Sequence, residues 1–423
     1  MQLPKERRKT LWFLRIAPAA FFVYDLKTVF KRRRAARNRV CFVLLFFSSG
    51  KEVKMKKVLR RAALALAIVL GALVLLFAGY VGYLQLQYYR IEDNLALEVA
   101  NAPAEPLAAG EEYTAVTCNL GFGAYGPDYS FFMDTGVMED GTPTQGLYGK
   151  ARSEEDVLAN TAAGLDALED LDADLLLLQE VDYDSHRSHF VDQRQMALDA
   201  FFDYGSIWGQ NFHSGYLAYP LTDHHGVVNA GLLTLTRYAA ESGVRRSYPV
   251  DESFFIKFTD LDRCFTVLYL PVEGADGQLA LIHSHMSAYD EGGTVRARQL
   301  ELLCDVMEEE YEKGNYVIVG GDFNHALYGT EHAFESRQQF PGWVQTLTDA
   351  DLPEHFSFVA ADNGFEVATC RGADIPYQPE VNYTTVVDGF IVSDNVAASA
   401  ENIDADFAFS DHNPVALTFK LAA

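Results

Sequence analysis

The 423-residue chain is 49% hydrophobic and 13% aromatic, which excludes a disordered protein and leaves ample material for a folded core. Its net charge of −25 is unevenly distributed: residues 1–61 carry 18 Lys and Arg against three acids, and residues 62–423 carry 16 against 56, a balance of −40. Because nucleic-acid binding depends on Lys and Arg contacts with phosphates, this balance disfavours long nucleic acids as partners without excluding them. The five cysteines lack CxxC spacing, which argues against a zinc or redox site.

Residues 1–54 form a basic segment that contains Lys31-Arg-Arg-Arg34 and shows no periodicity typical of a domain. Lys51-Glu-Val-Lys54 can be encoded by a purine-rich bacterial ribosome-binding sequence placed directly before Met55. We therefore hypothesise that translation starts at Met55, which the codons used at residues 51–53 would test. If residues 1–54 are translated, the basic run can act as a cytoplasmic arm at an anionic leaflet.

Residues 62–84 contain no charge and consist mainly of Ala, Leu, Val and Gly. These 23 residues can span a bilayer, whereas the apolar region of a signal peptide is typically ~7–15 residues long. The flank 55–61 is basic and only Arg90 follows closely, so the positive-inside rule predicts a cytoplasmic N-terminus and an extracellular remainder. A cleaved, unusually long signal peptide is the alternative.

Residues 85–112 are rich in Ala, Pro and Glu without a strong period, and we interpret them as a linker with Tyr88 and Tyr89 at the membrane interface. The folded domain is expected at 113–423. It begins with an alternating strand, Tyr113–Asn119, and continues with a helix whose N-cap is Ser153.

The run Asp174-Leu-Leu-Leu-Leu-Gln-Glu180 is typical of a strand buried on both faces. Further predicted strands are Val227–Leu235, Cys264–Leu270, Leu279–His285, Tyr316–Val319, Val386–Val392 and Pro414–Phe419, and further helices are Gln193–Phe202 and Thr294–Glu312. Strands and helices that alternate irregularly favour an α/β sandwich over a doubly wound nucleotide-binding fold.

Polar residues stand at the ends of these apolar strands. A single Asp or His in such a position is usually a turn residue, a cap or an ordinary surface or core side chain. Here a whole series occurs, which is difficult to explain as turns: Asn119, Glu180, His285, Asp322, Asn324, Asp388, Asp411 and His412.

The same order resembles the endonuclease/exonuclease/phosphatase superfamily of magnesium-dependent phosphoesterases, which includes DNase I-like nucleases, neutral sphingomyelinases and inositol-phosphate phosphatases. The matching elements lie between residues 113 and 420 and are Cys118-Asn119, Leu178-Gln-Glu180, Ser284-His285, Gly320-Gly-Asp-Phe-Asn324, Val387-Asp388-Gly-Phe-Ile391 and Ser410-Asp-His412. The resemblance implies a four-layer α/β sandwich, with two mixed β-sheets face to face and helices outside, preceded here by one transmembrane helix.

The resemblance also implies roles for these residues. A divalent cation, Mg²⁺ or Mn²⁺, would be held by Glu180, Asn119 and Asp411, because these cations prefer oxygen ligands. His412, oriented by Asp388, would act as general base or phosphate contact.

By the same resemblance, Asp322 would position or activate the attacking water and Asn324 would hold a phosphate oxygen. His285 would stabilise or protonate the leaving side.

Signals outside this set are weaker. Arg187 and Arg263 are rare cations in an acidic domain; each can bind substrate phosphate or pair with a neighbouring carboxylate. Asn229 stands in a position that resembles the family's Asn-x-Gly before a strand, so a substrate role is an open alternative.

We therefore expect an outward-facing, membrane-anchored phosphoester hydrolase that acts on a small phosphodiester, a phosphomonoester or a lipid headgroup. An extracellular nuclease of the same chemistry is the first alternative, and the acidic balance counts against it. A catalytically inactive membrane-anchored binding module is the second, and the complete set of polar residues counts against it. No feature of the sequence indicates a protein partner.

Overall fold

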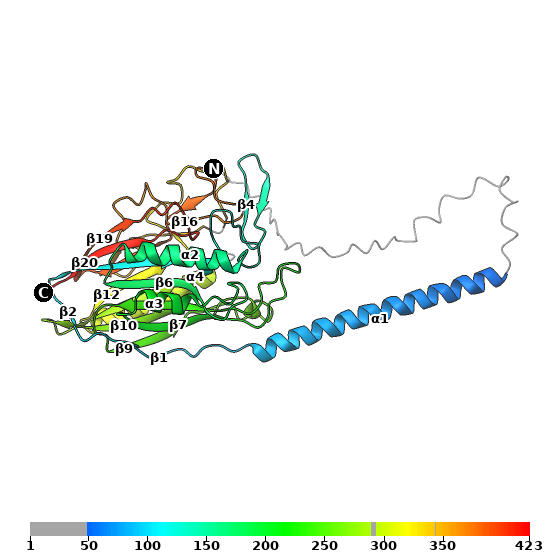
Figure 1. The fold of residues 1–423 in the computed structure, drawn as a ribbon, viewed down its shortest axis with the longest axis horizontal. Helices are drawn as coiled ribbons and strands as arrows, with labels where there is room; N and C mark the ends of the chain where they lie inside the picture. The colour runs from blue at the N-terminus through cyan, green and yellow to red at the C-terminus, as the bar shows by residue number, and fades with distance from the viewer. Residues whose placement is uncertain (1–48, 289–292, 343) are drawn as a thin grey trace, which may run out of the picture. The chain divides into compact units, whose positions relative to one another are not determined.

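The computed structural model describes residues 49–288, 293–342 and 344–423 (Figure 1). The expectations for residues 1–48 lie outside this range. Residues 77–423 form one compact unit, and the helix residues before Phe77 belong to another.

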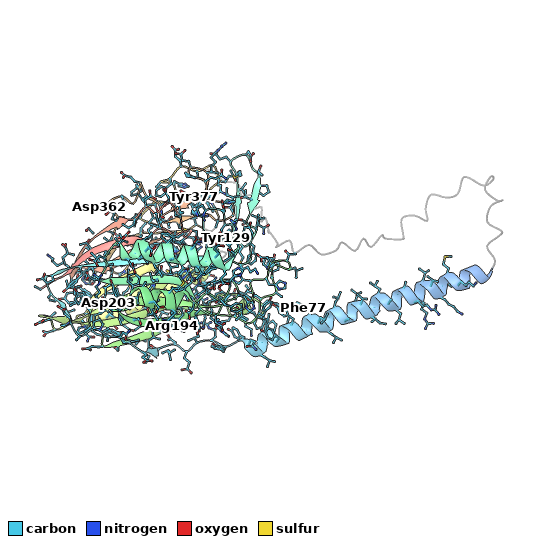
Figure 2. All side chains as sticks on the ribbon, in the orientation of Figure 1. Phe77, Tyr129, Arg194, Asp203, Asp362 and Tyr377 are labelled. Atoms are coloured by element: carbon cyan, nitrogen blue, oxygen red, sulfur yellow. The ribbon has the colours of Figure 1, made fainter. Side chains whose placement is uncertain are left out.

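Helix α1 (Ser49–Gln87) contains the predicted span and extends beyond it at both ends. Its segment Lys54–Gln87 is long and apolar enough to cross a membrane, and among the described residues it is the one helix that meets this criterion. Leu64, Leu70 and Leu75 are among its exposed side chains, which project to all sides of the helix in Figure 2. This surface is compatible with a lipid environment.

Two mixed β-sheets occupy the centre of residues 77–423. One has the strand order β1–β9–β10–β11–β12–β18–β15, with β2 paired to β10, and the other has the order β19–β20–β3–β6–β8–β7. The first comprises β1 (Leu95–Leu97), β2 (Leu107–Ala108), β9 (Ser242–Ser247), β10 (Cys264–Glu273), β11 (Gln278–His285), β12 (Tyr316–Asp322), β15 (Phe356–Phe358) and β18 (Asp388–Ser393). The second comprises β3 (Glu112–Asn119), β6 (Leu175–Asp182), β7 (Gly205–His213), β8 (Asn229–Thr236), β19 (Val396–Asn402) and β20 (Val415–Leu421).

The sheets are flanked by helices and small hairpins. The helices are α2 (Glu154–Glu169), α3 (Gln193–Ala200) and α4 (Thr294–Glu312), with single 3₁₀ turns η1 (Gly121–Gly123), η2 (Ile256–Phe258) and η3 (Asp349–Asp351). Three two-stranded sheets pair β4 (Thr135–Val137) with β5 (Pro143–Gln145), β13 (Ala326–Leu327) with β14 (Thr346–Leu347), and β16 (Cys370–Arg371) with β17 (Thr384–Thr385).

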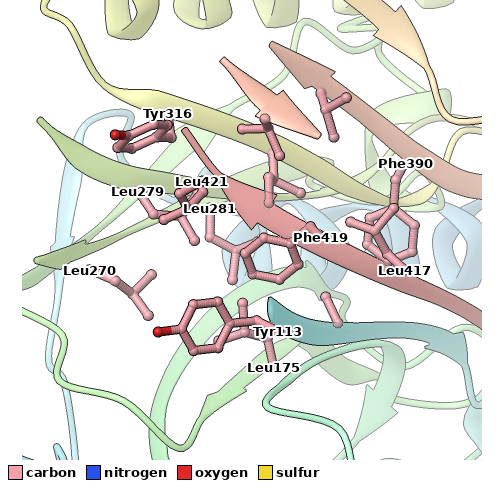
Figure 3. Close-up of a cluster of buried hydrophobic side chains, with 14 of the residues drawn as sticks. Tyr113, Leu175, Leu270, Leu279, Leu281, Tyr316, Phe390, Leu417, Phe419 and Leu421 are labelled. Carbon is pink, nitrogen blue, oxygen red and sulfur yellow. The ribbon is translucent and has the colours of Figure 1, made fainter. Parts of the chain in front are cut away.

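The apolar run of β6 is buried on both faces, as its continuous hydrophobicity predicts. Leu175 and Leu177 lie in the core between the two sheets, which Figure 3 shows in close-up. Leu176 and Leu178 point the other way and pack in a second cluster with Leu165 of α2. Because side chains alternate along a strand, one run of leucines joins two layers of the core.

Strand β11 behaves in the same way in the facing sheet. Leu279 and Leu281 enter the core between the sheets, whereas Ala280 and Ile282 pack outward in a cluster that includes Leu303 of α4. The order of layers is therefore helices, sheet, sheet and helix. This confirms the expected four-layer α/β sandwich.

Residues 85–112 differ from the linker that the sequence suggested. Strand β1 pairs with β9, and β2 runs parallel to β10 with Leu107 fully buried. The Ile91 amide also donates to the Asp262 carboxylate at 2.7 Å. These strands of two and three residues are too short to produce a readable period, so the folded unit begins well before Tyr113.

Three longer strands were also missed, namely β7, β9 and β19. Strand β7 contains Gly205 and Gly209, and β9 contains Arg245 and Arg246, residues that are unusual in a strand pattern. Arg245 is nonetheless fully buried, since its guanidinium donates to backbone carbonyls of Gln210 and Asp262. Tertiary hydrogen bonds therefore hold Arg245 in a buried strand that its own residue type does not predict.

Candidate active site

The polar strand ends of both sheets meet at one edge of the sandwich. Strands β3 and β6 are parallel, as are β11 and β12, so Asn119, Glu180, His285 and Asp322 lie towards the same end. Strand β18 runs antiparallel to β12, and its first residue, Asp388, pairs in register with Asp322. The fold therefore assembles residues that are far apart in the chain.

Asp322 is the centre of this arrangement. Its Oδ2 atom accepts a hydrogen bond from Asn119 Nδ2 at 3.1 Å and lies 3.3 Å from His285 Nε2 and 3.8 Å from His412 Nε2. Its Oδ1 atom accepts the Asn324 amide at 2.8 Å. One buried carboxylate thus contacts side chains from both sheets.

Two glycines before Asp322 allow the strands to approach this closely. A Cβ atom at Gly321, whose φ is +147°, would lie 1.9 Å from the carbonyl oxygen of Ser284 in β11. A Cβ atom at Gly320 would lie 2.5 Å from the Phe390 ring. Only glycine fits, and the close packing brings His285 beside Asp322.

Burial raises the pKa of Asp322 to about 7, and the negative charge of Asp388 adds to this effect while His412 opposes it. A carboxylate with such a pKa can accept a proton near neutral pH, which an ordinary aspartate does poorly.

His412 is held by the second aspartate. Its Nδ1 atom lies 2.7 Å from Asp388 Oδ2, and both side chains are buried. Burial alone would lower the pKa of His412, but Asp388, Cys370 and Asp322 raise it well above its ordinary value. His412 is therefore positively charged at neutral pH, with Nε2 directed at Asp322.

His285 has the opposite character. It is 1% exposed, and burial together with the positive charge of Arg263 lowers its pKa well below the ordinary value. His285 is therefore a neutral imidazole whose Nε2 atom lies 3.3 Å from the Asp322 carboxylate. The two histidines that flank Asp322 thus differ in charge.

Glu180 occupies a bulge in β6. The register against β8 shifts between Leu178 and Val181, and Glu180 has a φ of +51°, which is unusual for a residue with a side chain. The bulge turns the carboxylate out of the alternating pattern and leaves it 24% exposed, the most accessible carboxylate among those described above. Such strain is common at functional positions.

The donor set around Glu180 fits a hard divalent cation. Burial and then the charge of the neighbouring Glu180 raise the pKa of Asp411, against the opposing effects of His412 and Arg371. The Asn119 amide oxygen accepts the Gly121 amide at 2.9 Å and retains a second lone pair. Two mutually repelling carboxylates and an amide oxygen match the ligands that Mg²⁺ or Mn²⁺ prefers.

A second group of ligand atoms, from Asp322, Asp388 and His412, lies within 4.8 Å of one another. The His412–Asp388 hydrogen bond already occupies two of these atoms, so we interpret this group as a proton-holding relay and the Glu180 group as the cation site.

Asn324 points partly away from this centre. Its side chain donates to the Met286 carbonyl at 2.9 Å, and its φ is +50°. The Asn324 side chain thus ties the loop after β12 to Met286, and the Asn324 backbone amide holds the Asp322 carboxylate.

The three weaker candidates lie at different distances from this centre. Arg187 forms a bidentate pair with buried Asp182, at 2.8 and 3.0 Å, and its Nη2 atom is 3.7 Å from Glu180, so the ion-pair interpretation describes its present contacts. Arg263 is buried close enough to His285 to lower its pKa. Asn229 bonds to the Asp184 carbonyl and to His213.

Two residues near the site escaped the sequence reasoning. Tyr125 is buried, and burial followed by the charge of Asp411 raises its pKa well above the ordinary value. Arg371 is 2% exposed and donates to the Tyr125 carbonyl at 3.1 Å. Burial lowers the pKa of Arg371, and the negative charge of Asp411 opposes this effect. Both residues lie outside the long apolar strands whose polar ends identified the other site residues, so no hydrophobic periodicity pointed to them.

A buried polar network supports the site from behind. Gln179 Nε2 contacts Thr117 Oγ1 and His283 Nε2, and His283 Nδ1 lies 2.9 Å from Thr234 Oγ1. Burial lowers the pKa of His283 to about 3. Gln179 directly precedes Glu180 in β6, and His283 lies two residues before His285 in β11. Their hydrogen bonds therefore hold the ends of both strands in place.

Comparison with known proteins agrees with this geometry. The profile of the Endonuclease/Exonuclease/phosphatase family matches residues 117–412. A search of curated proteins gives no match.

Similar solved structures include TDP2 from C. elegans, 15% identical, with 73% of this chain and 75% of that chain covered and a TM-score of 0.45. An endonuclease/exonuclease/phosphatase from Beutenbergia cavernae is 16% identical, with 74% and 72% covered and a TM-score of 0.46. A family protein from Leptotrichia buccalis is 11% identical, with 73% and 100% covered and a TM-score of 0.46.

Proposed function

Because the chain belongs to the endonuclease/exonuclease/phosphatase family, and is thus a phosphoester hydrolase, we propose that it uses Mg²⁺ or Mn²⁺ to cleave a small phosphodiester, a phosphomonoester or a lipid headgroup. The observation that carries the proposal is the contact of Asp322 Oδ2 with Asn119, His285 and His412, beside the carboxylates of Glu180 and Asp411.

Asp322 is the residue that orients the attacking water and accepts its proton. Its raised pKa supports this role, since a carboxylate whose pKa lies near neutrality can take up a proton from water. Asn119 and His285 hold the carboxylate in place through its Oδ2 atom. The role proposed for His285 is therefore to position Asp322 rather than to protonate the leaving group.

His412 contacts a phosphoryl oxygen. Its positive charge and its Nε2 hydrogen are suited to an anion, and the Asp388 hydrogen bond fixes the ring. A divalent cation held by Glu180, Asp411 and Asn119 would supply further neutralisation of the phosphoryl oxygens. Asn324 keeps the loop after β12 closed and can turn its amide towards phosphate.

We further propose that α1 anchors the enzyme in the cell membrane, with the N-terminus cytoplasmic and residues 85–423 outside. The apolar, exposed helix and the basic flank of Lys56, Lys57, Arg60 and Arg61 support this topology. Protease added to intact cells should then remove the catalytic domain, and protection of that domain would contradict the orientation.

The test of the proposed function is hydrolysis by the full chain in detergent micelles. Four substrates separate the alternatives: bis(p-nitrophenyl) phosphate, sphingomyelin, an inositol phosphate and linear DNA. We expect metal-dependent turnover of at least one of the first three and a loss of about 100-fold or more in Asp322→Ala. DNA as the best substrate would favour the nuclease alternative, and no turnover of any substrate would favour the binding module.

A further inference from the structure

The last turns of α1 are fixed to the catalytic unit by a loop that follows β7. The Tyr80 hydroxyl donates to the Tyr216 carbonyl and accepts the Ala218 amide, both at 3.0 Å. The Tyr83 hydroxyl accepts the Tyr216 amide at 3.1 Å. The loop is therefore bound directly to the helix end by three hydrogen bonds.

A second loop, between β9 and β10, packs against the same helix end. Phe258 shares a buried cluster with Leu84, and its ring lies 5.8 Å from that of Tyr88. The Lys257 ammonium donates to Gln85 Oε1 at 2.9 Å and lies 4.8 Å from the Tyr88 ring. A lysine among aromatic rings is typical of the membrane–water interface.

Both loops expose large apolar side chains beside these contacts. Tyr219 and Leu221 are 63% and 81% exposed, and Phe254, Phe255 and Ile256 are 50%, 62% and 45% exposed. We call these five residues the apolar collar. Scattered apolar residues are normal on a protein surface, but a group gathered on two adjacent loops indicates an interaction site.

We propose that the apolar collar inserts into the interface of the bilayer that α1 spans. This inference rests on the membrane anchoring proposed above. From Tyr80 to Gln87 the helix rises about 10 Å, and the polar layer on each side of the hydrocarbon core is about 5–8 Å thick. Because the predicted span ends at Leu84, the loop residues that contact Tyr83, Leu84 and Gln85 thus lie where the hydrocarbon core meets the headgroups.

The occupant of the collar is lipid rather than another protein. The collar loops contact the last turns of α1, and α1 is one continuous helix whose earlier residues, such as Leu73 and Leu76, expose apolar side chains. Lipid that covers those residues continues to the collar, whereas a protein partner would have to displace it. Aromatic side chains with polar edges suit this layer.

The loop that carries Tyr219 and Leu221 of the collar is linked to the proposed cation site by a series of side-chain contacts. Tyr216, which holds the helix, has its ring 5.0 Å from that of His186, and the next residue, Arg187, lies 3.7 Å from Glu180. A cavity of about 550 Å³ lies beside Tyr216 and His186, with the collar residue Leu221 in its wall. Insertion of the collar would therefore bring the active site to phosphoesters of the lipid headgroups.

Fluorescence quenching by brominated lipids tests the proposal without reference to activity. The full chain is reconstituted in phosphatidylcholine vesicles with or without bromine on the acyl chains, as Phe255→Trp and as the matched control Phe365→Trp. Phe365 is 58% exposed, and Asp362, three residues before it, lies on the opposite side of the catalytic unit from Phe77 in Figure 2. The spectrum of the parent chain is subtracted, because it contains three tryptophans.

We expect the added emission of Phe255→Trp to shift to the blue and to fall at least twofold in brominated vesicles, with no change for Phe365→Trp. Vesicle flotation is measured in parallel. A chain that floats but shows no quenching at position 255 contradicts the collar alone. A blue shift without quenching indicates a second copy of the chain and also contradicts it. A chain that does not float contradicts the anchor and the collar together, while turnover in micelles would leave the proposed chemistry intact.

Discussion

Asp322 Oδ2 lies within 3.8 Å of side chains supplied by the ends of β3 and β11 and by the turn before β20. Asn119 and His285 were identified in the sequence as the last residues of apolar strands, and His412 by its place just before the last strand, because strand ends of a sandwich converge at one edge. The contact distances, and the difference in charge between neutral His285 and positively charged His412, were not predictable. They depend on burial and on neighbours that are remote in the chain.

The His412–Asp388 pair gives a test at the scale of one residue. Asp388→Asn keeps the size of the side chain but removes the negative charge that orients and charges His412. We expect kcat to fall by about 10²- to 10⁴-fold with a smaller change in KM. The matched control is Asp394→Asn, because Asp394 forms a similar 2.9 Å contact with His355 at the surface. Equal effects of the two substitutions would contradict the role of Asp388.

His283 gives a test of pH dependence. Its pKa is about 3 in the folded chain because of burial, against 6.5 in the unfolded chain. The unfolded chain therefore takes up a proton below pH 6.5 that the folded chain refuses, and stability falls as the pH decreases. This one group should contribute about 1.4 kcal/mol per pH unit between pH 6 and pH 4.

We expect His283→Gln to be less stable at pH 7, since the contacts with Gln179 and Thr234 change, but to lose less stability on acidification than the parent chain. Urea unfolding at pH 7, 6 and 5 measures this difference. The surface variant His355→Gln serves as control and should keep the parent slope. A His283→Gln chain with that same slope would show that His283 is not held neutral.

At the scale of elements, the strands that carry the site were the most predictable. Strands β6, β11 and β12 are buried on both faces, so their apolar runs are continuous and their ends are marked by polar residues. Strands β7 and β9 lie towards the sheet edges and carry glycine or arginine, and their positions are set by tertiary contacts. The bulge at Glu180 was also not predictable from the sequence, because glutamate is not a residue type that indicates a positive φ.

The two glycines of β12 give the test at this scale. In Gly321→Ala the new Cβ atom would lie 1.9 Å from the Ser284 carbonyl oxygen, which belongs to backbone and cannot turn aside. We expect a loss of roughly 2 kcal/mol or more in unfolding free energy, measured by urea unfolding. Gly342→Ala is the control, since nothing lies within 4 Å of its Cβ position and little change is expected. Equal stability of the two variants would contradict the close approach of β11 and β12.

At the scale of the whole molecule, charge and anchoring act together. The balance of −40 beyond residue 61 would disfavour long polyanions, whereas under the proposed function a short phosphoester would meet mainly the local field of His412 and of a cation held by Glu180. Residues 85–112, for which the composition suggested a linker, contain strands β1 and β2, which pair with β9 and β10 of the sheet.

The initial rate of bis(p-nitrophenyl) phosphate hydrolysis by the full chain, stripped with EDTA and titrated with Mg²⁺ or Mn²⁺, tests the central claim most directly. We predict negligible turnover after stripping, full recovery with either cation, and a higher cation requirement for Glu180→Gln. Asp322→Ala should stay inactive at every cation concentration. Turnover that survives EDTA, or an Asp322→Ala chain as active as the parent, would contradict a metal-assisted hydrolase centred on Asp322.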